Sequence, residues 1–374
     1  MSTVINARSP YYIKFSYPSG SQPIVDVQMS VAIYTGDKNQ TLSASSYQYT
    51  LKKKPNTSVI GNQVVFEISE LIRDYLKTNY FTTAVDAVWV NTETIVNFTS
   101  QSSLVDVDYL AIDGFGYYPE GINPRTTSTP MVLQSNKTVY FVPGRDIRIP
   151  VFSENTPTIG TSISSVWDLV DEFWDVEDAN WEATTSDQVV VDSDISSQKI
   201  QYINIDSTNA VDGDTITFTG ADGTIETITL RMICERRGYD AYRAVYYNKF
   251  GALQSFWVTQ RSSITTKAKS ENYRANIVDL DTLTYNTTDH SRKRFNVNGV
   301  QSIQVNTPLI DEAQNDALEE LILSEQCWLE KDASTVFPVV VKSESVERKT
   351  KLNDKLIQYT LDFDFAYSTI NDLR

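Results

Sequence analysis

The amino-acid sequence predicts a mainly β protein built from β-sandwich domains, with a few short helices. Tyr, Thr, Ser and Asn are plentiful, a composition that suits strands and turns. Short runs of alternating apolar and polar residues recur along the chain, with turn signals about every 8–12 residues. A chain of 374 residues is long enough for two or three domains, so we expect several such units.

Residues 1–125 are predicted to form an N-terminal β-sandwich domain. The expected strands are 10–15, 25–34, 47–51, 63–68, 87–90 and 104–111. Ser69 is expected to cap a short helix over 70–76, because its apolar residues fall on one side. The domain should end at 123–130, where two prolines bracket polar residues.

Residues 126–300 are predicted to form a middle β domain. Its expected strands are 138–142, 146–152, 199–205, 214–218, 224–234, 242–247 and 253–258. The pair Asp222-Gly223 predicts a tight hairpin between two of them. Residues 262–296 are polar, and we expect them to be a connection without strands.

The middle domain contains an acidic stretch at 165–198, with ten carboxylates and no Lys or Arg. Apolar residues recur there at helical spacing, and Ser165 with Asp168 has the spacing of a capping box, so an amphipathic helix is predicted. One interpretation is a docking surface for a partner. The alternative is a helix that packs on its own domain and exposes its acidic face to solvent. The candidate interface residues are Val166, Leu169, Val170, Phe173, Trp174 and Trp181.

Residues 301–374 are predicted to form a helix followed by a long antiparallel β-hairpin. The helix spans 311–323, with carboxylates in its first turns where the helix dipole favours them. The hairpin strands are 337–341 and 356–365, and the second alternates with a period of two. Its dry face should be Leu361, Phe363 and Phe365. This part either completes the sheet of the middle domain or forms a small third domain.

The charge of the chain argues against a nucleic-acid partner, because a net charge of −16 repels phosphate. The basic clusters 52–54 and 292–294 are expected to be solvated turn edges. No run of 18 apolar residues occurs, so we expect synthesis in a cytoplasm and no membrane insertion. Cys234 and Cys327 are far apart in sequence, and both are expected to be buried without a disulfide framework.

No catalytic, cofactor-binding or metal-binding constellation is predicted. His290 is the single histidine and lies in a polar segment, and neither a nucleophile elbow nor a phosphate-binding loop occurs. Carboxylate pairs could serve glycoside hydrolysis, although a chain this acidic generates such pairs without a purpose. These pairs are Asp106 with Asp108, Asp192 with Asp194, Asp212 with Asp214, and Asp362 with Asp364. Possible sugar platforms are Tyr117-Tyr118 and Tyr246-Tyr247, unless these aromatics fill the core.

Three segments, 65–75, 248–257 and 352–366, resemble structural proteins of tailed bacteriophages that infect Bacteroidetes-type and marine bacteria. The resemblance covers the N-terminal domain and the last third of the chain, and it carries no active-site motif. It implies immunoglobulin-like β domains in a non-enzymatic virion protein of the tail or baseplate region. The implied partners are other tail proteins and copies of the chain itself. The alternative is a virion protein that binds or degrades host surface glycans during receptor recognition.

Overall fold

The computed structural model of the protein is mainly β, and its strands form several sheets. The structure describes residues 3–16, 23–35, 42–55, 63–76, 80, 87–123, 132–152, 158–163, 189–190, 200–219, 223, 225–233, 238–332, 334–343, 345 and 357–370. The chain forms two compact units. The first comprises Met1–Cys234 and Tyr246–Ser255, and the second comprises Glu235–Val245 and Phe256–Arg374.

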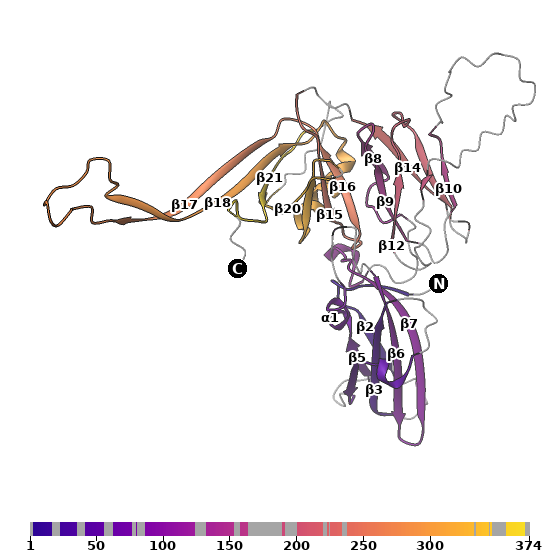
Figure 1. Ribbon diagram of the computed structural model, residues 1–374. Helices are drawn as coiled ribbons and strands as arrows, with labels where there is room; N and C mark the ends of the chain where they lie inside the picture. Colours follow the sequence, from indigo (N-terminus) through magenta and orange to yellow (C-terminus); the bar gives the residue numbers. More distant parts are fainter. Residues whose placement is uncertain are drawn as a thin grey trace, which may run out of the picture. The chain divides into compact units, whose positions relative to one another are not determined.

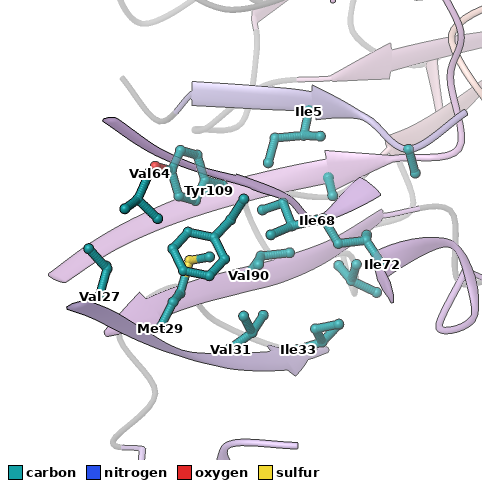
Figure 2. Packing of buried hydrophobic residues seen from close by; sticks show 14 of the residues in the cluster. Ile5, Val27, Met29, Val31, Ile33, Val64, Ile68, Ile72, Val90 and Tyr109 are labelled. Carbon is teal, nitrogen blue, oxygen red and sulfur yellow. The ribbon is translucent and has the colours of Figure 1, made fainter. Parts of the chain in front are cut away.

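The N-terminal part of the first unit contains two sheets around one core. The five-stranded sheet has the order β1 (Thr3–Asn6), β7 (Ser102–Ile112), β6 (Ala87–Phe98), β3 (Ile24–Tyr34) and β4 (Tyr49–Lys53). The second sheet pairs β2 (Tyr12–Ser16) with β5 (Gln63–Glu67), and α1 (Ser69–Arg73) follows β5. Figure 2 shows the core that they share, where Met29 and Val90 of the larger sheet lie among Val64 of β5 and Ile72 of α1. The predicted strands of this region are therefore present.

The start of α1 differs from the prediction. Ser69 is the first residue of the helix, and Ile68 occupies the N-cap position without a side-chain cap. The Ser69 hydroxyl instead donates a hydrogen bond to the Glu67 carboxylate. The prediction that Ser69 caps the helix is therefore wrong, because a nearby carboxylate competes for the hydroxyl.

The middle region of the first unit contains two further sheets that share a second core. One has the order β10 (Thr158–Thr161), β13 (Thr215–Thr219), β14 (Ile225–Met232) and β8 (Thr138–Phe141). The other has the order β11 (Val189–Val190), β12 (Ile200–Ile205) and β9 (Ile147–Phe152). Ile149, Ile216 and Phe218 are fully buried in the shared core. β13 and β14 pair antiparallel, which confirms the hairpin predicted from Asp222-Gly223.

A seven-stranded sheet organises the C-terminal part of the chain. Its order is β16 (Leu253–Val258), β15 (Tyr242–Tyr247), β19 (Cys327–Glu330), β20 (Val336–Val341), β21 (Thr360–Phe365), β18 (Arg292–Asn306) and β17 (Ser263–Arg274). β20 and β21 pair antiparallel, so the predicted C-terminal hairpin is confirmed. Leu361, Phe363 and Phe365 are buried as predicted.

The predicted helix of this region is divided into two pieces. A short 3-10 helix, η3 (Glu312–Gln314), precedes α2 (Asn315–Leu323). Ala317, Leu318 and Leu321 of α2 are buried, so one face of this helix is apolar and packed. The carboxylates Glu312 and Asp316 lie in the first turns of these two elements.

Candidate assembly surface

The longest strand pair of the seven-stranded sheet extends well beyond the rest of that sheet. β18 pairs with β21 only from Ser302 to Asn306, whereas it pairs with β17 from Arg292 to Gln304. Residues 266–301 thus form a two-stranded ribbon with its connecting loop, which we call the arm (Figure 1). The prediction that 262–296 is a connection without strands is wrong.

The arm is exposed on both of its faces. Every residue of β17 except Ser270 is exposed, and so are nearly all residues of the connecting loop. A solvated ribbon needs no alternation of apolar residues, and this explains why the sequence pattern gave no strand there. An isolated two-stranded hairpin is marginally stable in water, so the arm gains little from its own pairing.

Large apolar side chains nevertheless point into solvent at the tip of the arm. The exposed fractions are 77% for Leu280, 78% for Leu283 and 63% for Tyr285. The tip is an ordered turn: the Asp279 N–H donates to the Thr284 carbonyl at 2.9 Å, and Leu283 has a φ of 52°. Exposed apolar clusters on a protein surface commonly mark contact sites for partners.

The two strands of the arm are basic. They carry Lys267, Lys269, Arg274, Arg292, Lys293 and Arg294. Glu271 is their single acidic residue, although the chain as a whole has 48 Asp and Glu residues against 32 Lys and Arg residues. The predicted cluster 292–294 therefore lies in a strand and not at a turn edge.

Three arginines share one face of the arm. Arg274 and Arg292 are directly opposite each other, and Arg294 is opposite Asn272 on the same face. Like charges in directly opposed positions destabilise a strand pair. Arg294 donates to the Ser270 hydroxyl at 3.0 Å. Among the residues that the structure describes, no carboxylate forms a salt bridge with any of the three. We call Arg274, Arg292 and Arg294 the arginine face.

The outer face of β6 and β7 carries the opposite charge. Glu93 is directly opposite Asp106, and Asn91 is directly opposite Asp108. The Asn91 amide donates to Asp106 at 2.7 Å and to Asp108 at 2.8 Å. We call Glu93, Asp106 and Asp108 the acidic face. On this face, two like charges, Glu93 and Asp106, are opposite each other, and the neutral Asn91 amide bridges Asp106 and Asp108.

Neighbouring side chains show how this acidic face is built. The Tyr47 hydroxyl donates to the Asn91 side-chain oxygen at 3.1 Å. Burial is the main cause that raises the pKa of Tyr47 to about 12. A hydrogen bond to the Glu93 carboxylate and the negative charge of Glu93 raise this pKa further. One pair further along the strands, Ile95 is opposite Leu104, and their exposed fractions are 36% and 62%. Carboxylates and exposed apolar side chains thus lie together on one sheet face.

The other carboxylate pairs that the structure describes have ion-pair or hydrogen-bond partners. Asp212 forms a salt bridge with Arg231 at 3.0 Å, and Asp214 accepts a hydrogen bond from the Ser162 hydroxyl at 3.0 Å. Asp362 accepts from the Gln304 amide at 2.9 Å. These pairs support strands and loops where they lie. No group of three or more His, Cys, Asp or Glu residues in the described ranges has an arrangement that could hold a metal ion.

The two predicted aromatic platforms differ in burial. Tyr246 and Tyr247 are buried with exposed fractions of 0% and 3%, so this pair is core. Tyr118 is fully exposed, whereas Tyr117 packs edge-on against Phe115 with ring centroids 5.5 Å apart. A depression of about 90 Å³ is lined by Val132, Gln134, Lys137, Glu226, Thr227, Ile228 and Phe250, and it is far smaller than the ~300 Å³ of ordinary ligand pockets.

Several residues discussed in the sequence analysis belong to neither the arginine face nor the acidic face. His290 is an exposed residue of the loop of the arm. Cys327 is buried as expected, and burial raises the pKa of its thiol. The carboxylates Asp192 and Asp194, Cys234, and the candidate interface residues Val166, Leu169, Val170, Phe173, Trp174 and Trp181 lie outside the described residues, so those interpretations stay predictions.

No protein-family model matches the chain, and a search of curated proteins finds no match. Within the described ranges, no helix has both the length and the apolar character needed to cross a membrane.

Proposed function

We propose that the protein is a bacteriophage virion structural protein of the tail or baseplate region. In this proposal it works through assembly interfaces with other tail proteins and with copies of itself, and it performs no catalysis. The arm is the observation that carries the proposal: a ribbon with exposed leucines and unneutralised arginines is poorly stabilised alone and suited to contact with a neighbouring subunit.

The proposal includes immunoglobulin-like sandwiches as the domain type. Two features support this part. In the N-terminal region, a five-stranded and a two-stranded sheet enclose one core, and in the middle region a four-stranded and a three-stranded sheet enclose another. Paired sheets over a common core are the basic plan of a β-sandwich.

A second candidate function is host-glycan recognition by a virion protein, with binding or cleavage of the polysaccharide. The fully exposed Tyr118 favours it, because an exposed aromatic ring can stack on a sugar. One fact weighs against it: Tyr246 and Tyr247 are core residues.

Particle labelling and imaging test the virion role that both candidates share, and a glycan-binding measurement separates the two candidates. Antibodies against the purified protein should label the tails of intact phage particles, and imaging of the particles should show the protein repeated under tail symmetry. Absence of the protein from purified particles would refute the virion role. A monomer that binds or degrades host polysaccharide, with binding lost in Tyr118→Ala, would favour the glycan candidate.

A further inference from the structure

We propose that the arginine face of one copy docks on the acidic face of a second copy. This inference rests on the proposed function and deepens it, because it names the partner and the two surfaces that meet. The surfaces are Arg274, Arg292 and Arg294 of the arm, and Glu93, Asp106 and Asp108 on the outer face of β6 and β7.

Charge complementarity is the first argument. Each surface contains a like-charge pair in directly opposed strand positions, Arg274 with Arg292 and Glu93 with Asp106. Each pair destabilises its own strand pairing as long as the charges stay unneutralised. Contact between the two surfaces places cations beside carboxylates and relieves both repulsions together. Planar guanidinium groups also match carboxylates with paired hydrogen bonds.

Apolar side chains supply the second argument and distinguish a protein partner from a phosphate polymer. Leu280 and Leu283 at the tip of the arm are more than three-quarters exposed, and the acidic face is flanked by the exposed Ile95 and Leu104. Exposed leucines beside the arginines fit a mixed protein surface better than a phosphate backbone.

The geometry of such a contact predicts its symmetry. The two surfaces are different, so the contact is heterologous: each copy offers an arm to one neighbour and an acidic face to another. Heterologous contacts close into rings when the rotation permits and otherwise continue as open filaments. Repeated contacts of this kind suit a protein present in many copies in a tail.

A charge-swap experiment on the full-length protein tests the inference. Sedimentation velocity at low salt should show the wild type self-associated, and association should weaken as salt rises because exposed charges are screened. R274E/R292E and E93K/D106K should each self-associate about 10-fold to 100-fold more weakly. A mixture of the two variants should associate again, because each altered surface then finds a complementary one.

A matched control separates these surfaces from a general effect of charge. K331E/K342E changes the net charge by the same amount as R274E/R292E, at exposed lysines outside the arm that pair with Asp240 and Asp364. It should retain self-association. Thermal melting of each variant should show that the fold is kept, since the substituted side chains of the arm are exposed.

Several results would overturn the inference while leaving the virion role intact. These are a wild-type protein that labels phage tails yet stays monomeric at low salt, a double variant that assembles like the wild type, or a mixture that fails to recover. Binding of a DNA duplex that requires Arg274 and Arg292, without self-association that requires them, would identify nucleic acid as the partner of the arm. Absence from particles would instead refute the proposed function itself.

Discussion

Gly251 packs directly against the main chain of Asp113. A β-carbon at position 251 would lie 2.5 Å from the carbonyl carbon of Asp113, and Gly251 has a φ of +72°. Asp113 is itself held in place, because its carboxylate accepts hydrogen bonds from the Arg8 side chain at 2.9 and 2.6 Å. The loop between β15 and β16 therefore approaches the end of β7 at a point where only glycine fits.

Gly251→Ala should accordingly destabilise the first compact unit. The control is Gly144→Ala, because Gly144 has a similar φ of +74° and open space around its α-carbon. The control isolates the left-handed backbone penalty of about 1 kcal/mol, and Gly251→Ala should cost about 1–3 kcal/mol more. Urea denaturation followed by tryptophan fluorescence measures both. Equal losses in the two variants would contradict the close approach.

The buried ion pair between Arg243 and Glu330 gives a second prediction. The side chains are 8% and 4% exposed, and the Arg243 guanidinium also lies over the Trp257 ring at 5.4 Å. Glu330→Gln should lower the free energy of unfolding by about 3–5 kcal/mol, because it leaves a buried cation without its counterion. R243M/E330M should be less destabilised than that single variant, since it buries no charge. Chemical denaturation of both variants provides the check, and a double variant weaker than the single would refute the reasoning.

Phe363 tests the dry face of β21. It is fully buried and directly opposite Ile303 of β18 and Val341 of β20. Phe363→Asp should cost about 4 kcal/mol or more, because it buries a carboxylate among apolar side chains. Asp364→Asn on the other face should cost at most about 1 kcal/mol, since its salt bridge with Lys342 is exposed. Thermal denaturation compares the two, and unchanged stability of Phe363→Asp would refute the assignment of faces.

Asp332 gives a prediction for pH dependence. Hydrogen bonds from the Ser334 and Thr335 side chains and from the Ser334 N–H lower the pKa of Asp332 to about 2. A carboxyl with a depressed pKa in the folded state stabilises the fold above its unfolded pKa of about 4, and that contribution is lost as pH falls through about 2. Carbon NMR titration of the carboxyl should show this low pKa. In Ser334→Ala the pKa should rise, and an unchanged value would contradict the cause given.

The sequence predicted strands whose apolar residues report burial on one face, as in β21, or on both faces, as in β15 and β16. β21 alternates apolar and acidic residues because one face packs in the sheet core and the other meets water, and β15 and β16 are bounded as expected by turn residues. A short-range pattern reports burial, so it identified these strands. The position of α1 was harder, because the Ser69 hydroxyl could bond either the helix end or Glu67, and only the folded geometry decides.

The strands of the arm were not predicted, because they are not buried. Its strands are solvated on both sides, so neither face needs apolar residues. The alternation of apolar and polar residues that predicts a strand is therefore absent. One signal was present: β18 alternates at Ile303 and Val305, where the strand enters the sheet. The acidic face was visible only as one carboxylate pair among several. Its pairing with Glu93 depends on strand register, which the sequence does not display.

The ladder of the arm also has a mechanical consequence. Because most of the arm's strand residues are exposed, its length can change while the sheet that anchors it keeps its packing. Adding two residues to each strand would carry the tip outward by about 7 Å and keep the side chains of the arginine face on the same side of the ribbon. Adding one residue to each strand would move these side chains to the opposite side. The reach of the arm can therefore be changed in steps of two residues by small insertions that keep the same side chains on the same face.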